Sequence, residues 1–311
     1  MTAPLFDTRQ VRRAFSRSAR SYDAVAQLQR LAEARLLESL DYWDDPALAR
    51  PAPTVVLDLG CGTGHASGLL QQRWPKAQVV SMDLALPMLQ QARAASRRAP
   101  LPVAHWLPNP FAPVPRQVCA DARRLPLAEG SVDVIFSNLC LQWVEDLGAV
   151  LNGFRRVLKP HGLLLFSTFG PETLWELRDA FAQADAAPHV SPFVDTAGVG
   201  DALVNAGFFQ PVVDRDEETT VYPDLAALMR ELRALGATNA LASRRPTLTG
   251  RGRFAAAATA YEAHRFDAGL PATWEIISAM AWAPAPGAPI REGGADLVAV
   301  PVSRIPIRRR G

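Results

Sequence analysis

A glycine-rich turn is the part of this sequence whose residue types and spacing best suit ligand binding. Residues 55–64 read VVLDLGCGTG, so that Asp58 stands two positions before the first of three alternating glycines. These glycines are Gly60, Gly62 and Gly64. Glycine lets a chain turn tightly from a strand into a helix and lets the backbone approach a ligand closely. Asp83 ends the next apolar run. A carboxylate at this position can accept hydrogen bonds from both hydroxyls of a ribose. The pattern predicts a site for a nucleoside-containing cofactor.

The segments around this turn alternate between short apolar runs and helical patterns. Strands are expected at 54–59, 78–83, 117–120, 132–136 and 162–169, and helices between them at 65–74, 87–98 and 147–158. This alternation predicts an α/β fold with a Rossmann-like, doubly wound and mostly parallel sheet. In such a sheet the ligand crevice lies beyond the carboxyl ends of the strands, which is where the glycine turn would be.

The flanking segments have a different pattern. Helices are expected within 8–40, and later at 173–184, 196–206, 225–235 and 254–264, with closing strands near Val212 and at 274–280. We expect a helical N-terminal lid over 1–50 and a core domain over 51–283. Cap insertions are expected at about 171–206 and 223–269, and a C-terminal tail at 284–311. The proline-rich stretch at 99–115 is expected to be an inserted loop.

The glycine spacing discriminates between cofactors. A dinucleotide fingerprint is G-x-G-x-x-G, whereas this turn reads D-x-G-x-G-x-G, which resembles the first motif of class I S-adenosylmethionine methyltransferases. Residues 119–126 (CADARRLP), 137–143 (SNLCLQW) and 158–162 (LKPHG, with His161 where the family has glycine) resemble further segments of that family.

The resemblance implies S-adenosyl-L-methionine as cofactor and a role for each matching residue. Asp58 would face the ammonium of the methionine part, Asp83 the ribose and Asp121 the adenine amino group. The remaining residues expected to contact the cofactor are Leu84, Met88, Ala122 and Asn138.

A second resemblance covers nearly the whole chain, from about residue 10 to 283. Residues 15–23 (FSRSARSYD) resemble the F-x-x-x-A-x-x-Y-D opening of the malonyl-[acyl-carrier protein] O-methyltransferases of biotin synthesis. Further resemblances are at 139–146, 166–174, 189–195 and 232–244. The family acts on the free carboxylate of a malonyl thioester, so that the methyl ester can be elongated towards pimeloyl.

This reaction needs positioning more than proton transfer. A carboxylate with a pKa near 4 is ionised at pH 7, so no general base is required. The resemblance makes Tyr22 and Arg244 candidates for binding that carboxylate, and Trp143 a candidate wall of the methyl pocket or of the pantetheine arm. Each has an ordinary structural alternative: a helix anchor, a surface arginine and a core tryptophan.

Malonyl-acyl carrier protein is the partner that this resemblance implies. Carrier proteins are acidic, so a basic face is expected, and four arginines lie at roughly helical spacing near the N-terminus: Arg12, Arg13, Arg17 and Arg20. The same residues could instead form a plain solvated helix face.

The overall composition restricts the class of protein. The net charge is only +2, and we find no base-clamping motif or basic aromatic stripe, so no nucleic-acid partner is expected. The three cysteines show no CxxC spacing, which predicts neither a metal site nor a disulfide framework. No apolar run approaches about 20 residues, so we expect no membrane association and a cytoplasmic location.

Three alternatives remain open from the sequence. The chain could methylate another small acid or a quinone precursor. It could modify a partner protein, because mitochondrial complex I assembly factors share a similar N-terminus and cap. It could also be a non-enzymatic assembly scaffold, although a scaffold has no need of an intact D-x-G-x-G-x-G turn.

Overall fold

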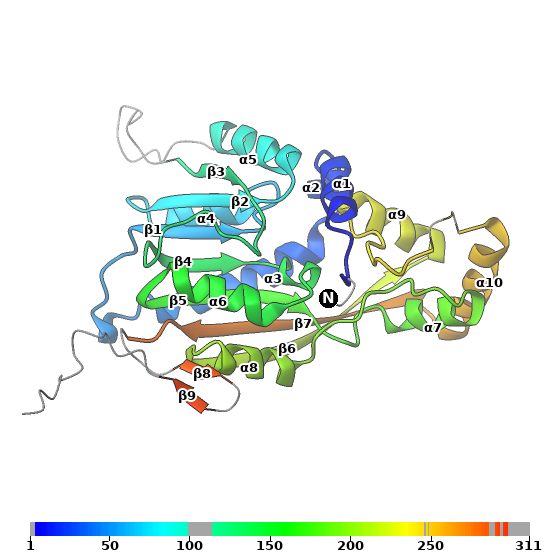
Figure 1. Cartoon of the computed structure of the whole chain (residues 1–311). Coiled ribbons are helices and arrows are strands. Elements are labelled where there is room, and N and C mark those ends of the chain that lie inside the picture. The colour runs from blue at the N-terminus through cyan, green and yellow to red at the C-terminus, as the bar shows by residue number, and fades with distance from the viewer. Residues whose placement is uncertain are drawn as a thin grey trace, which may run out of the picture.

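A seven-stranded sheet forms the centre of the molecule (Figure 1). The computed structural model describes residues 4–98, 114–245, 247, 249–285, 290–292 and 295–297. The strands are β1 (Val55–Leu59), β2 (Gln78–Asp83), β3 (Arg116–Cys119), β4 (Val132–Ser137), β5 (Leu158–Phe169), β6 (Phe209–Tyr222) and β7 (Leu270–Trp282). Their order is β3-β2-β1-β4-β5-β7-β6, with β1 to β5 parallel and β7 antiparallel to both of its neighbours. The predicted doubly wound, mostly parallel sheet is confirmed.

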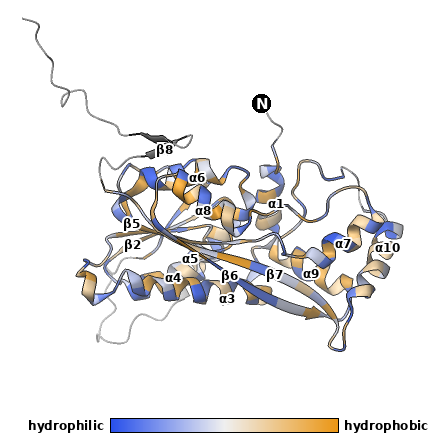
Figure 2. Ribbon diagram, turned by 90° about the horizontal axis from the view of Figure 1, so that it is seen from below, coloured by the Kyte–Doolittle hydropathy of each residue, from blue (hydrophilic) through white to orange (hydrophobic). Residues whose placement is uncertain are grey.

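Helices cover both faces of this sheet (Figure 2). The helices on one face are α3 (Gln27–Glu38) and α4 (His65–Arg73), and those on the other are α6 (Leu147–Val157) and α8 (Thr196–Asn205). Successive strand residues point to opposite faces, so Val56 packs with the α3 and α4 side and Leu57 with the α6 and α8 side. Because both faces are covered, the central strands are apolar on both sides.

A cap is built on the far ends of the two longest antiparallel strands. In Figure 1, β6 and β7 run beyond the rest of the sheet and carry three helices. These are α7 (Trp175–Ala184), α9 (Leu225–Leu235) and α10 (Arg251–Tyr261). Their buried residues form one apolar cluster with the outer half of β7. Although α8 lies in the range 171–206 expected to belong to the cap, Val199 and Leu203 bury it against the sheet beside α6.

The N-terminal helices lie between the sheet and this cap. The first two are α1 (Thr8–Ser18) and α2 (Tyr22–Val25), which contact α9. Asp7 caps α1 by accepting hydrogen bonds from Arg9 N and Gln10 N at 3.1 and 3.2 Å. The preceding segment is bonded to the cap, because Asp7 N donates to Ala240 O and Ala242 N donates to Leu5 O, both at 2.8 Å.

The remaining elements are one helix beside β2 and several short segments. They are α5 (Leu86–Arg98), the 3₁₀ helices η1 (Ser39–Tyr42), η2 (Pro46–Leu48), η3 (Leu141–Trp143) and η4 (Glu262–His264), and the strands β8 (Ile290–Glu292) and β9 (Ala295–Leu297). β8 and β9 pair as a hairpin within the expected tail, while most of the proline-rich stretch lies outside the described residues. No helix in the described ranges has the length and hydropathy of a membrane span.

Candidate active site

The glycine turn has the geometry that its sequence predicts. Gly60, Gly62 and Gly64 have φ values of +69°, +54° and +84°, a region of backbone conformation that residues with a Cβ atom rarely adopt. Gly60 N donates to Met82 O at 2.8 Å, and Gly62 N donates to Asp83 Oδ2 at 3.0 Å. The turn between β1 and α4 is therefore bonded directly to the carboxyl end of β2.

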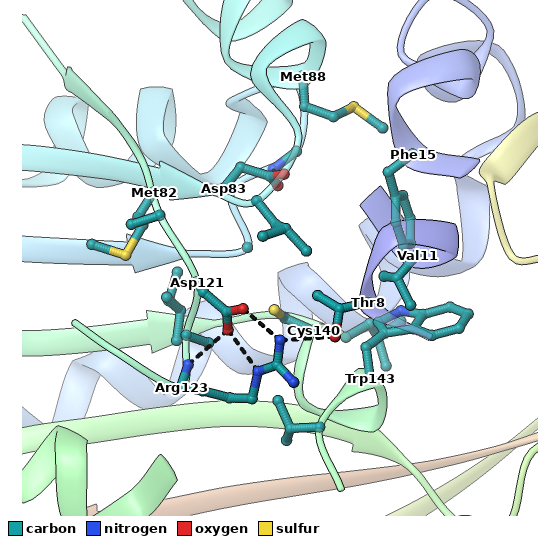
Figure 3. Close-up of a pocket in the computed structure, with 18 of the residues that line it drawn as sticks. Thr8, Val11, Phe15, Met82, Asp83, Met88, Asp121, Arg123, Cys140 and Trp143 are labelled. Carbon is teal, nitrogen blue, oxygen red and sulfur yellow. Dashed lines mark hydrogen bonds and ion pairs between the residues drawn. The ribbon is translucent and has the colours of Figure 1, made fainter. Parts of the chain in front are cut away.

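A cavity opens beside this turn, at the carboxyl ends of the central strands (Figure 3). Of the residues expected to contact the cofactor, those that line it are Gly60, Gly62, Asp83, Leu84, Met88, Asp121, Ala122 and Asn138. Val11 and Phe15 of α1 cover it from the opposite side. Gly64 does not line the cavity but begins α4, where its Cα faces Ala92 of α5.

Asp83 is a partly buried carboxyl that lines this cavity beside the glycine turn. Its Oδ1 accepts from Ala85 N at 2.7 Å while Oδ2 accepts from Gly62 N. Burial raises the pKa of this carboxyl to about 6, although backbone hydrogen bonds act in the opposite direction. The carboxylate is thus held rigidly between the glycine turn and the start of α5.

A second, polar hollow continues from the first past Tyr22 and Asn138. Asp58 lines it, together with Arg30, Glu33 and His65. Ser67 Oγ donates to Asp58 Oδ2 at 2.5 Å, and burial raises the pKa of Asp58 to about 7. Acidic groups beside one arginine suit a ligand that carries both an ammonium and a carboxylate. Asn138 itself is fixed, since it donates to Gln29 O at 2.9 Å and accepts from Ser167 Oγ at 2.7 Å.

Asp121 has an ion-pair partner that links the cavity floor to α1. Arg123 Nη2 is 2.6 Å from Asp121 Oδ2 and donates to Thr8 Oγ1 at 2.9 Å (Figure 3). The guanidinium of Arg123 also holds the pKa of Asp121 below its usual value. Arg123 therefore fastens the start of α1 across the open side of the cavity.

Trp143 separates this cavity from a larger apolar one beneath the cap. Its side chain lines both cavities and packs edge-on against Phe6 and Phe15. The walls of the cap cavity come from η3, β5, α7, α9 and β7, and include Phe169, Phe181 and Trp274. The two cavities therefore adjoin each other at Trp143.

Comparison with known proteins identifies the kind of protein that has this arrangement. A methyltransferase domain model matches residues 57–166. The chain is 58% identical to the malonyl-[acyl-carrier protein] O-methyltransferase of Xylella fastidiosa, over 98% of each chain. It is 47% identical to that of Laribacter hongkongensis, over 90% of each chain. The chain belongs to the malonyl-[acyl-carrier protein] O-methyltransferase family.

Solved structures share the fold of this family member at low identity. A methyltransferase of unassigned substrate from Bacillus halodurans superposes with a TM-score of 0.55 at 17% identity, over 81% of this chain and 99% of that one. Phosphoethanolamine N-methyltransferase 2 of Haemonchus contortus, in complex with S-adenosyl-L-methionine, gives 0.51 at 14% identity, over 86% of this chain and 57% of that one. These likenesses concern the fold alone.

Two of the three residues expected to serve this family's substrate lie at the cavities. Tyr22 lines the cofactor cavity and the polar hollow, and Trp143 lines the shared wall. Arg244 lies elsewhere: its Nη2 is 2.9 Å from Asp7 Oδ2 and its Nη1 donates to Leu241 O at 2.8 Å. Arg244 thus links the N-terminal segment to the cap loop of this methyltransferase, and its expected contact with the substrate carboxylate stays a prediction.

The sequence predicted a helical N-terminal lid but not which of its residues line the cofactor cavity. Thr8, Val11 and Phe15 lie on the face of α1 opposite its exposed arginines, at helical spacing. An apolar stripe on an arginine-rich helix was the available signal. Arg123 and Cys140 also line the cavity and were not predicted. The local sequence does not indicate which side chains in the loops after the strands point towards the cavity.

Proposed function

We propose that the protein transfers a methyl group from S-adenosyl-L-methionine to the free carboxylate of malonyl-acyl carrier protein, as a step towards biotin. The observation that carries the proposal is the cap cavity, which meets the cofactor cavity at Trp143. Identity to the curated relatives extends through the segments that build this cap, well beyond the matched methyltransferase domain.

The residues present fit this cofactor. Asp83 is placed to accept hydrogen bonds from the ribose hydroxyls, and Asp58 lies in the polar hollow suited to the methionine ammonium. Gln29 Oε1 is buried beside that hollow without a partner among the described residues, which leaves an acceptor for the same ammonium. Asp121, Ala122, Leu84 and Met88 would surround the adenine, and Gly60, Gly62 and Asn138 the reacting end.

The reaction requires that the carboxylate be aligned with the methyl group and that water be excluded from the site. When bound, the cofactor supplies an electrophilic methyl group on its sulfonium. A carboxylate oxygen can attack this methyl group directly, because it has no proton to lose. Tyr22 is placed to donate a hydrogen bond to the carboxylate, because burial and the neighbouring Asp83 raise the pKa of its hydroxyl and keep it protonated. Val11, Phe15 and Trp143 exclude water from the junction, which strengthens such polar contacts.

Replacing Tyr22 by phenylalanine tests this role. The hydroxyl has no hydrogen-bond partner among the described residues, so its loss leaves no protein group unpaired. We expect kcat to fall about tenfold or more, the value of one hydrogen bond to a charged group, with little change in cofactor affinity. Steady-state rates and calorimetry provide the two readouts. An unchanged kcat in Tyr22→Phe would mean that the hydroxyl does not bind the substrate carboxylate and that Tyr22 only anchors α2.

Cofactor affinity should depend on pH through the two buried carboxyls. Asp83 and Asp58, with pKa values near 6 and 7, lose their charge as the pH falls. Only the ionised forms accept both ribose hydroxyls and attract an ammonium, so affinity should be highest above pH 7. We expect it to fall at least about tenfold between pH 8 and pH 5.5. In Asp58→Asn, titration calorimetry should show a smaller fall in cofactor affinity, confined to the region near pH 6. An identical pH profile of affinity in the wild type and the variant would contradict the assignment of Asp58 to the ammonium.

One labelling experiment distinguishes the proposed acceptor from the alternatives. The protein is incubated with methyl-labelled cofactor and, separately, malonyl-carrier protein, small acids, a quinone precursor or a candidate partner protein. We expect label on the malonyl carrier, released by mild base as expected of a methyl ester. Label confined to another acceptor, or no cofactor binding at all, would reject the proposal.

Two further assignments rest on this function. The exposed arginines expected to face the acidic carrier are Arg12, Arg13 and Arg17 of α1 and Arg20 in the turn that follows it, and none has an ion-pair partner among the described residues. Arg244 acts as a positioning residue that holds α1 in place, in contrast to the expected contact with substrate. A cytoplasmic location and the absence of a nucleic-acid partner stay predictions.

A further inference from the structure

The cap cavity must receive a substrate that is attached to a protein. A malonyl group on a carrier protein is held at the end of a flexible phosphopantetheine arm, which has a phosphodiester near the protein, two amides along its length and the thioester at its tip. The cavity therefore needs an opening on the surface that receives the phosphate.

A surface hollow between α1 and α9 adjoins the cap cavity. Arg17 of α1 and Arg230 and Arg233 of α9 line this hollow, and Arg233 and Thr238 line the cap cavity as well. The two spaces thus share a boundary made by α9 and the loop that follows it.

The three arginines at this hollow are exposed and have no acidic partner among the described residues. Other arginines of the described chain are engaged, for example Arg30 with Asp23 and Arg245 with Asp185. Guanidinium groups left without carboxylates on two adjoining helices form a site of positive potential, and their fork geometry matches phosphate oxygens.

The boundary between the hollow and the cavity has an unused polar atom. Thr238 Oγ1 is buried and has no hydrogen-bond partner among the described residues. Buried hydroxyls are almost always paired, so this one points to a ligand group. An amide of the arm, passing from the surface hollow to Trp143, would supply that partner.

We propose that the hollow between α1 and α9 is the entrance for the phosphopantetheine arm, with its phosphate bound by Arg17, Arg230 and Arg233. The acidic carrier then rests on the exposed arginine face of α1, and the thioester reaches the wall at Trp143. This inference rests on the proposed function, since it needs a malonyl carrier as substrate.

Charge reversal at the outer rim tests the entrance. Arg17→Glu and Arg230→Glu change residues that line the hollow but not the cap cavity. With malonyl-carrier protein at low salt, we expect the double variant to lose about tenfold or more in kcat/KM. With malonyl-N-acetylcysteamine, which has neither phosphate nor protein, the rate should change less than about twofold.

The control is Arg93→Glu with Arg97→Glu, an exposed pair on α5 that makes the same change in net charge at residues that do not line the hollow. It should retain carrier-dependent activity. Adding salt should slow the wild type with the carrier and affect the rim variant much less.

Each remaining outcome overturns something specific. Equal losses with both substrates, or losses as large in the α5 control, would overturn the entrance. Loss in Arg230→Glu with none in Arg17→Glu would place the arm on the α10 side of α9, in the second hollow that Arg230 lines, and would also overturn it. A wild-type protein that methylates neither malonyl substrate would instead reject the proposed function.

Discussion

Replacing Asp83 by alanine is expected to weaken binding of S-adenosyl-L-methionine by at least about 100-fold, because hydrogen bonds to a charged group contribute about 1.5–3 kcal/mol each. The loss has two sources. The variant removes the acceptor for the ribose hydroxyls, and it leaves Gly62 N and Ala85 N without their present partner. Titration calorimetry at pH 8, where the wild-type carboxyl is ionised, gives the affinity directly.

Two further variants separate these sources. Asp83→Asn retains one oxygen and should lose less affinity than Asp83→Ala, provided that the loop remains bonded through it. Glu129→Ala removes an exposed carboxylate from the surface and should leave affinity unchanged. Cofactor affinity in Asp83→Ala within about threefold of the wild type would mean that the ribose is held elsewhere.

Replacing Gly60 by alanine is expected to abolish measurable cofactor binding and to lower the melting temperature. The new Cβ would lie 2.4 Å from Cys140 Sγ and 2.5 Å from Cys140 Cβ, well inside van der Waals contact. The φ of +69° adds about 1–2 kcal/mol of backbone strain for any residue with a Cβ. Both terms act on the turn that forms the floor of the cavity.

The clash can be tested separately from the strain. Cys140→Gly in the same chain removes both contacting atoms, so the double variant should recover part of the affinity and retain only the strain. Gly68→Ala is the matched control, because its Cβ would meet nothing within 4 Å inside α4 and alanine favours a helix by up to about 1 kcal/mol. Wild-type affinity in Gly60→Ala would refute the geometry of the turn.

Local patterns predicted the fold well wherever they repeat along the chain. The helix expected at 225–235 is α9 with the same bounds, because Leu225, Leu228, Leu232 and Leu235 form one apolar stripe. His161, which stands where the family has glycine, adopts φ +62°, a region that glycine favours, inside β5 beside a register shift in its pairing with β4. The doubly wound sheet followed from alternating elements alone.

Contacts between distant segments could not be predicted in the same way. Arg244 and Asp7 are separated by 237 positions, and no periodicity indicates that they meet. The helical pattern of α8 shows an apolar face but not whether that face meets the sheet or the cap. The residues predicted to contact the cofactor belong to one turn and the adjacent strand ends, which is why local patterns point to them, whereas the walls of the cap cavity come from five separate elements.

The bonding of residues 5–7 to the loop at 240–244 has a kinetic consequence. Phe6 forms a bridge with Leu241, and the same loop continues from the cap-cavity wall at Thr238 and Asn239. The cover of the donor cavity and one side of the acceptor cavity are therefore bonded to each other. We expect that a displacement of α1 that admits the donor also loosens the acceptor side, so turnover should be sequential and ordered, with the donor arriving first and its demethylated product leaving last. Competitive inhibition by that product against the donor, together with noncompetitive inhibition against the malonyl carrier, is the pattern that this order produces.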